Sequence, residues 1–201
     1  MGIIKDKKSK IKNRVIYPVI LSVPASAKEL TRRERVKYLS RHARRALKIS
    51  AEKSGIQLGE LIKEDNGSPM PIDGNYWSVT HKPEYVGGVI ASERIGIDIE
   101  KIRPCSKALF KKTADDREWA LGDSDSLTLF FRYWTSKEAV LKAWGTGLTD
   151  LSKCRIVQII DDNNLIINYK NKKWFVEQYF FKGHVASVIK TTSRIEWTLF
   201  T

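Results

Sequence analysis

Two short stretches of the sequence carry carboxylate and lysine side chains at spacings that suit metal and phosphate chemistry. Asp98 and Glu100 stand two residues apart in a β-branched run, and Glu138 and Lys142 stand four residues apart about 40 residues later. Mg²⁺ in proteins is usually held by one or two carboxylates together with the phosphates of a substrate. A lysine one helical turn from such a carboxylate is placed to neutralise a phosphate. The two stretches therefore predict chemistry on a metal-bound diphosphate.

The first stretch has the alternation of a β-strand. Over residues 94–100 the isoleucines fall on one face, and Gly96, Asp98 and Glu100 fall on the other. Two like charges on one face repel each other, and a metal cation would relieve this repulsion. A glycine in a strand also invites the close approach of another group. The alternative to a metal site is a polar edge that faces solvent.

The second stretch lies in a segment with helical composition. Glu138 and Lys142 are spaced as an ordinary surface ion pair, which contributes only a few tenths of a kcal/mol. The segment is nevertheless rich in large apolar side chains, namely Phe130, Phe131, Tyr133, Trp134, Val140, Leu141 and Trp144. Charges on a largely buried helix must be paired or must line a cleft. This favours a functional role for the pair.

Thr80 and His81 are a third group with suitable chemistry, at the end of a strand expected over residues 76–80. A hydroxyl and an imidazole side by side can both hold phosphate oxygens. A lone histidine is more often structural, so both interpretations stay open on spacing alone.

The chain has 201 residues and a formal net charge of +13. Basic side chains are concentrated in residues 28–53, where three glutamates oppose ten lysines and arginines. Such an excess predicts an acidic partner, which can be nucleic acid, anionic lipid, a phosphorylated small molecule or an acidic protein. A solvated helix face is the simpler explanation. A basic nucleic-acid-binding module also explains the charge, but it leaves the paired acidic residues unexplained, because these repel phosphate unless a metal is bound.

Other sequence features indicate a cytoplasmic protein that does not enter a membrane. No run approaches the roughly 18 apolar residues of a membrane span. The basic residues 1–14 lack the apolar stretch of a signal peptide and are expected to form a flexible tail. Cys105 and Cys154 are far apart and form no CxxC motif, which predicts reduced thiols.

Periodicity predicts two long helices among many strands. One helix is expected over 25–54, capped by Ser26 with Glu29 and stopped at Gly55. The other is expected over 127–144. A further helix-rich stretch covers 106–121, and strands are expected over 15–23, 76–80, 86–91, 94–100, 154–160, 164–169, 174–181, 185–190 and 195–200.

A faint internal repeat supports a duplicated α+β fold. Trp77-Ser78-Val79 leads to a glycine-rich strand about ten residues on, and Trp174-Phe175-Val176 leads to a similar strand. The predicted fold is α+β, with two similar lobes related by a pseudo-twofold duplication, each a small antiparallel sheet packed with a long helix. After the tail, the lobes are expected to span residues 15–93 and 94–201, the second carrying the metal site.

At this point the residues resemble a known family. Gly-Ile-Asp-Ile-Glu-Lys at 96–101 and Trp-x-x-Lys-Glu-Ala-x-x-Lys at 134–142 resemble the paired signature of the 4′-phosphopantetheinyl transferases. Trp-Ser-Val-Thr-His at 77–81 stands where the larger, two-lobed surfactin-type members carry a Ser-His pair. Asn-Gly-Ser-Pro at 66–69 resembles their Gly-Lys-Pro loop more weakly, with Ser68 in place of the lysine.

The resemblance implies an enzyme that moves phosphopantetheine from coenzyme A to a serine of an apo carrier protein and releases 3′,5′-adenosine diphosphate. It implies that Asp98, Glu100 and Glu138 hold Mg²⁺, or alternatively Mn²⁺, on the coenzyme A diphosphate. Glu138 and Lys142 are the expected catalytic residues. Glu138, or a water held by the metal cluster, is the candidate base for the serine proton.

The remaining contacts with coenzyme A are expected from Thr80, His81, Arg41, Arg44 and Lys137. The expected partners are coenzyme A and an acidic acyl or peptidyl carrier protein, with no nucleic acid and no membrane, and the enzyme is expected to be a monomer. A noncatalytic homologue that still binds coenzyme A or carrier is the remaining alternative, which the missing loop lysine keeps open.

Overall fold

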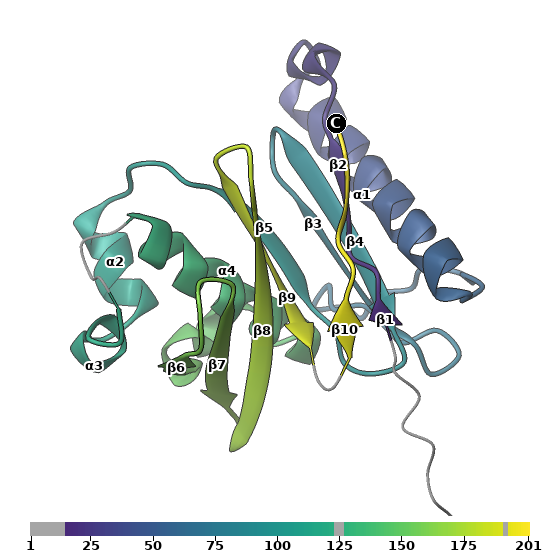
Figure 1. Cartoon of the computed structure of the whole chain (residues 1–201). Helices are drawn as coiled ribbons and strands as arrows, with labels where there is room; N and C mark the ends of the chain where they lie inside the picture. Colours follow the sequence, from purple (N-terminus) through teal and green to yellow (C-terminus); the bar gives the residue numbers. More distant parts are fainter. Residues whose placement is uncertain (1–14, 123–126, 191–192) are drawn as a thin grey trace, which may run out of the picture.

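The computed structural model describes residues 15–122, 127–190 and 193–201. The tail predicted over residues 1–14 lies outside this part. The described chain forms two units in which a long helix packs on a mainly antiparallel sheet, as Figure 1 shows. The predicted α+β class with two lobes is confirmed.

The first unit contains helix α1 and a four-stranded sheet in the order β11-β2-β4-β3. The bounds are Val19–Ser22 for β2, Arg32–Ser54 for α1, Tyr76–His81 for β3, Tyr85–Ala91 for β4 and Thr198–Phe200 for β11. Helix α1 buries its alanine- and leucine-rich face on β4. Gly88 permits this contact, because a Cβ at that position would collide with the backbone of Leu47.

Helix α1 begins later than the sequence predicted. Thr31 and Glu34 form a complete capping box at its start, and Gly55 ends it in the left-handed conformation with φ 65°. The predicted cap at Ser26 is wrong. Residues Ala25–Lys28 form a separate 3₁₀ turn, η1, which has no side-chain cap. The later Thr-Glu pair satisfies the free backbone N–H groups at the helix start.

The second unit contains helix α4 and a five-stranded antiparallel sheet in the order β5-β9-β8-β7-β6. The bounds are Ile97–Lys101 for β5, Leu127–Trp144 for α4, Arg155–Ile159 for β6, Asn164–Tyr169 for β7, Lys172–Phe181 for β8 and His184–Lys190 for β9. Helix α4 packs on β5 and β9. A Cβ on Gly96 would collide with the carbonyl oxygen of Ala139, so the close approach predicted at this glycine is made by α4 itself.

Three short elements flank α4. The stretch predicted as helix-rich divides into α2 (Lys107–Thr113) and α3 (Asp116–Trp119), because Ala114 is extended and Asp115 caps a new helix. A 3₁₀ segment, η2 (Gly147–Lys153), follows α4. Within the described ranges, no helix has the length and apolar character needed to cross a membrane.

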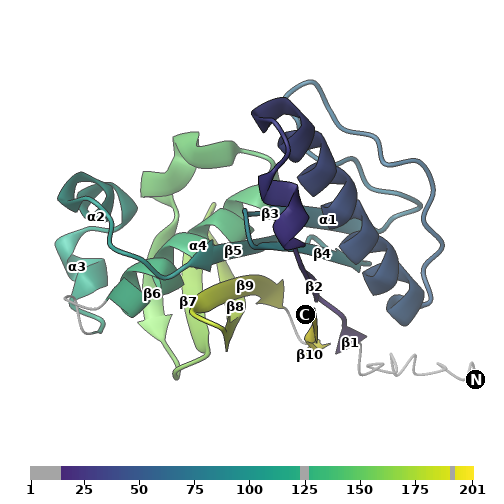
Figure 2. The ribbon, with the colours of Figure 1, turned by 90° about the horizontal axis from the view of Figure 1, so that it is seen from above.

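The two units share an apolar interface and exchange chain at the C-terminus. Ile20 and Tyr85 of the first unit pack with Ile99 and Phe181 of the second. Strand β10 (Arg194–Ile195) pairs with β1 (Val15–Ile16), and β11 pairs with β2, so the C-terminus lies beside the first strands in Figure 2.

The predicted division placed all of residues 94–201 in the second lobe, whereas the last two strands join the first. The reason is that β11 adds a strand to the open edge of β2, whose residues Val19 to Leu21 are buried. The single strand predicted over 195–200 is likewise two short strands.

Candidate active site

Strands β3 and β5 and helix α4 bring three predicted residues into direct contact. The hydroxyl of Thr80 on β3 donates to Asp98 Oδ1 on β5 at 2.9 Å. Lys142 Nζ on α4 donates to the same oxygen at 2.7 Å and to the carbonyl oxygen of Ile97 at 3.1 Å. Asp98 is buried, with 1% of its surface exposed. The two units therefore meet around this carboxylate.

Glu100 lies two residues after Asp98 on β5 and contacts a residue that the sequence did not indicate. Lys82 Nζ donates to Glu100 Oε1 at 2.6 Å. Lys82 directly follows His81 at the end of β3. Its position beside the Thr-His pair was the only signal in the sequence, because its partner lies 18 residues away on another strand.

Glu138 belongs to the same cluster through its electrostatics. Burial raises the pKa of its carboxyl group, and the negative charges of Asp98 and Glu100 raise it further, while Lys142 and Lys82 oppose the shift. The shift indicates that the three predicted metal ligands lie near one another. Among the described residues no ion pair within 4.0 Å involves Glu138, so its carboxylate is the least neutralised of the three.

His81 lies at the rim of this group. Its pKa is lowered, first by partial burial and then by the positive charge of Lys142, with smaller effects of Lys82 and Lys63. The imidazole is therefore mostly uncharged at pH 7. It lies near the lysines of the cluster, where it can donate one hydrogen bond to an anion.

The donor set suits a hard divalent cation. Asp98 Oδ2 is buried and has no hydrogen-bond partner, so one carboxylate oxygen is free for a further positive group. The described residues contain no group of three or more His, Cys, Asp or Glu that is already arranged to hold a metal ion. Lysine ammonium groups lie on Asp98 and Glu100 instead. The carboxylate oxygens and their negative charge suit Mg²⁺, but side chains must move before all three carboxylates can bind one ion.

A cavity of about 240 Å³ opens beside Lys142. The loop that resembles Gly-Lys-Pro forms one wall, where Ser68 Oγ donates to the carbonyl oxygen of Gly145 at 3.1 Å. Lys63 also lines this cavity. Ser68, which stands in place of the lysine, thus attaches the loop to the end of α4.

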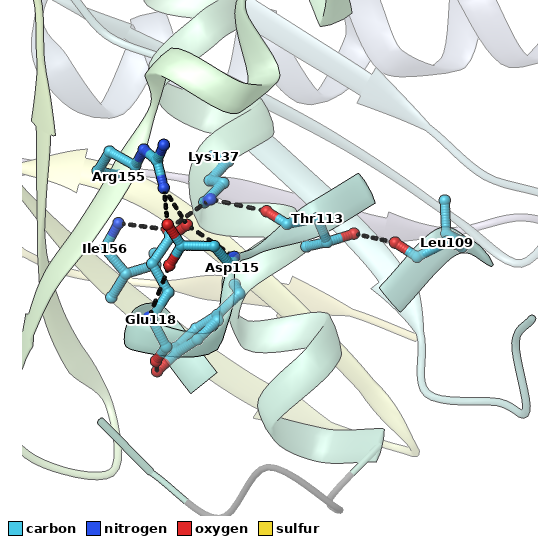
Figure 3. A network of polar contacts seen from close by, with 8 residues as sticks. Leu109, Thr113, Asp115, Glu118, Lys137, Arg155 and Ile156 are labelled. Carbon is cyan, nitrogen blue, oxygen red and sulfur yellow. Dashed lines mark hydrogen bonds and ion pairs between the residues drawn. The ribbon is translucent and has the colours of Figure 1, made fainter. Parts of the chain in front are cut away.

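Lys137 was predicted to contact coenzyme A, and the structure does not bring it to the cluster. Its fully buried ammonium pairs with Glu118 at 2.6 Å and donates to the carbonyl oxygen of Thr113 at 2.7 Å, as Figure 3 shows. Glu118 also accepts from the backbone N–H of Ile156 at 2.8 Å. Successive side chains on a helix diverge by about 100°, so Lys137 and Glu138 point to different surroundings.

Arg41 and Arg44 also lie apart from the cluster. Both are exposed on α1, which packs on the Trp77 and Val79 side of the first sheet. Thr80 faces the other side, toward β5. Figure 1 shows α1 on the side of this sheet away from α4. Within the described part of the chain, no hydrogen bond or ion pair joins either arginine to the cluster.

Comparison with known proteins points to the same family as the sequence motifs. Residues 94–190 match the model of the 4′-phosphopantetheinyl transferase superfamily. This range contains Asp98, Glu100, Glu138 and Lys142. This part of the chain is thus similar to the 4′-phosphopantetheinyl transferase superfamily.

Three relatives are similar to the chain at low identity. They are the 4′-phosphopantetheinyl transferase HetI of Nostoc sp. (32% identity over 68% of the chain), psf-1 of Bacillus pumilus (28% over 50%) and Sfp of Bacillus subtilis (32% over 37%). The matched parts cover 66%, 47% and 35% of those proteins, respectively. The chain thus matches about two thirds or less of each relative's length.

Proposed function

We propose that this chain transfers 4′-phosphopantetheine from coenzyme A to a serine hydroxyl of an apo carrier protein. The serine oxygen forms a bond to the phosphorus that carries pantetheine. The bond from that phosphorus to the bridging oxygen breaks, and 3′,5′-adenosine diphosphate leaves with the electron pair. The observation that carries this proposal is the convergence of Asp98, Glu100, Glu138 and Lys142 in the part of the chain that matches the superfamily.

Asp98, Glu100 and Glu138 would hold Mg²⁺, or Mn²⁺ in its place. The cation supplies charge neutralisation of the diphosphate when bound, which is the main requirement of phosphoryl transfer. Thr80 fixes the orientation of Asp98 through its 2.9 Å hydrogen bond. The unpartnered Asp98 Oδ2 supports this assignment, because a buried carboxylate oxygen without a partner is costly.

Glu138 accepts the proton of the carrier serine in this proposal. Among the described residues no ion pair within 4.0 Å involves Glu138, which leaves its carboxylate available to the serine hydroxyl. The ammonium of Lys142 neutralises charge on the transferring phosphoryl group. His81 donates a hydrogen bond to a phosphate oxygen from the rim.

We propose further that the enzyme acts as a monomer, since one chain supplies Thr80 from the first unit and Asp98 and Glu138 from the second. Carriers of this class are acidic, and the net charge of +13 suits an acidic partner. We expect the carrier Michaelis constant to rise with salt, because opposite charges are screened. A Michaelis constant that stays constant between low and physiological ionic strength would contradict electrostatic steering.

The direct test is intact mass spectrometry of a panel of apo carriers incubated with the protein, coenzyme A and Mg²⁺. The expected result is a gain of one phosphopantetheine on at least one carrier, lost when a chelator is added. No gain on any carrier, together with retention on heparin or DNA at physiological salt, would favour the nucleic-acid-binding alternative.

A further inference from the structure

The ion pair between Lys82 and Glu100 occupies a carboxylate that the proposed function assigns to a metal. We propose that Lys82 is a displaceable counter-ion, which neutralises Glu100 until a divalent cation binds that carboxylate and is then released toward the diphosphate of the substrate. This inference rests on the proposed function. It assigns to Lys82 a role in setting the affinity of the protein for the metal.

The contacts of the two lysines in the cluster differ. Lys142 donates both to Asp98 and to the carbonyl oxygen of Ile97, which fixes its ammonium on β5. The ammonium of Lys82 donates to Glu100 alone among the described residues. The side chain of Lys82 is 30% exposed and that of Glu100 is 15% exposed. Lys82 therefore loses fewer contacts than Lys142 when it moves away from its carboxylate.

The charges around Lys82 make it a competitor of the metal. Lys82 Nζ lies 2.6 Å from Glu100 Oε1, where a cation bound by that carboxylate would also lie. Two positive charges close to the same carboxylate oxygens repel each other, so each weakens the binding of the other.

Counting charges indicates where Lys82 goes. The three ionised carboxylates and two ammonium groups leave one negative charge in the cluster. A divalent cation would make the sum one positive charge, which attracts a diphosphate. A lysine has a flexible four-carbon side chain, so Lys82 can leave Glu100 and remain close enough to donate to the bound anion.

A second lysine provides a matched control. Lys101 Nζ pairs with Glu84 at 2.6 Å, the same length as the Lys82 pair, but its side chain is 52% exposed. Lys101 is on β5 directly after Glu100. Among the described residues, none of the side-chain hydrogen bonds and ion pairs of the cluster involves Lys101. Replacing Lys101 therefore removes one charge and one ion pair without changing the contacts of the cluster.

The test is calorimetric titration of Mg²⁺ and Mn²⁺ into chelator-treated protein, with and without coenzyme A, for wild type, Lys82→Met, Lys82→Gln and Lys101→Met. Without coenzyme A, both Lys82 variants should bind the metal roughly five- to twentyfold more tightly than wild type, because a partly exposed charge is only partly screened. Lys101→Met should stay within about twofold of wild type. With chelator present, the Lys82 variants should melt at a lower temperature than wild type, and added metal should raise their melting temperature more.

Equal or weaker metal binding by both Lys82 variants would overturn the inference while leaving the proposed transferase activity intact. If wild type binds neither metal, with or without coenzyme A, the metal assignment itself fails and the inference fails with it. Phosphopantetheine transfer measured on the same preparation separates these two results. Two replacements are used so that a folding defect in one does not decide the outcome.

Discussion

Two neighbouring residues of helix α4 serve two clusters of opposite character. Lys137 is fully buried, and its ammonium is held by Glu118 and by the carbonyl oxygen of Thr113. Glu138 lies among the carboxylates of Asp98 and Glu100, and no ion pair within 4.0 Å compensates its charge among the described residues. The charged groups around Lys137 and Glu118 are saturated with hydrogen-bond and ion-pair partners, and we call them the saturated cluster. The cluster around Glu138 contains carboxylate oxygens that lack such partners in the described part of the chain.

The difference separates groups that hold the fold from groups that are available to a ligand. Glu118 receives the ammonium of Lys137, the backbone N–H of Ile156 and, at 3.5 Å, the guanidinium of Arg155, so it has no capacity left. Asp98 keeps one buried oxygen without a partner. A structure retains such an unsatisfied group at a cost, which is typical of functional sites.

Removing the charge of Glu138 is expected to have the largest effect on activity. Glu138→Gln should lower the rate of transfer roughly 10³-fold, with a modest loss of coenzyme A binding, because the serine loses its proton acceptor. The variant should be at least as stable as wild type at pH 7. The raised pKa means that the charged form is disfavoured in the folded state, and this penalty grows as pH rises above the ordinary value of 4.5. Near-normal turnover would remove Glu138 from the mechanism.

Breaking the saturated cluster should affect stability first. Lys137→Met leaves Glu118 buried without its ammonium partner, which should lower the free energy of unfolding by about 3–5 kcal/mol. The double replacement Glu118→Gln with Lys137→Met removes both charges and keeps an acceptor for Ile156, and it should recover at least half of the loss. Urea denaturation of the three proteins measures this. A single variant as stable as wild type would show that the pair contributes little.

Tyr133 should give a smaller, pH-dependent effect in the saturated cluster. Its hydroxyl donates to the carbonyl oxygen of Glu118 at 2.8 Å, and burial raises its pKa to about 12. The unfolded phenol ionises near pH 10, so the folded state should lose stability as pH rises from about 10 to 12. Tyr133→Phe should cost about 1 kcal/mol at pH 7 and should weaken this alkaline loss. Ultraviolet titration would contradict the account if all tyrosines ionised near pH 10 in the folded protein.

His81 should give the smallest effect, at acid pH. Its lowered pKa means that the folded state disfavours its protonation, so stability is full above the unfolded value of 6.5 and declines as pH falls toward the folded value. His81→Gln should reduce the difference between urea midpoints measured at pH 7.5 and pH 5.5. An unchanged difference would mean that neither burial nor the nearby lysines disfavour the protonation of this imidazole in the folded state.

Local sequence patterns predicted much of the cluster around Asp98, Glu100, Glu138 and Lys142. The alternation of residues 94–100 placed Asp98 and Glu100 on one face, and the bounds predicted for α4 agree with the structure. The i,i+4 spacing of Glu138 and Lys142 and the Thr80-His81 pair at a strand end were equally local. These features depend on residues close in sequence, which is why periodicity could identify them.

The partners of the lysines could not be predicted in this way. Lys82 contacts Glu100, which lies 18 positions later in the chain, and Lys137 contacts Glu118, which lies 19 positions earlier. In each pair the two residues come from different elements. The direction of Lys137 depends on how α4 is rotated against its sheet, which tertiary packing decides. The C-terminal strands that return to β1 and β2 likewise depend on long-range pairing.

The comparison between Lys137 and Glu138 can be tested in one measurement. Apo carrier is incubated with coenzyme A, Mg²⁺ and either wild type, Glu138→Gln or the Glu118→Gln, Lys137→Met double variant, at a temperature where all three are folded, and intact mass is followed with time. The account predicts that wild type and the double variant add phosphopantetheine while Glu138→Gln leaves the carrier unmodified. Loss of transfer in the folded double variant, with transfer retained by Glu138→Gln, would contradict it.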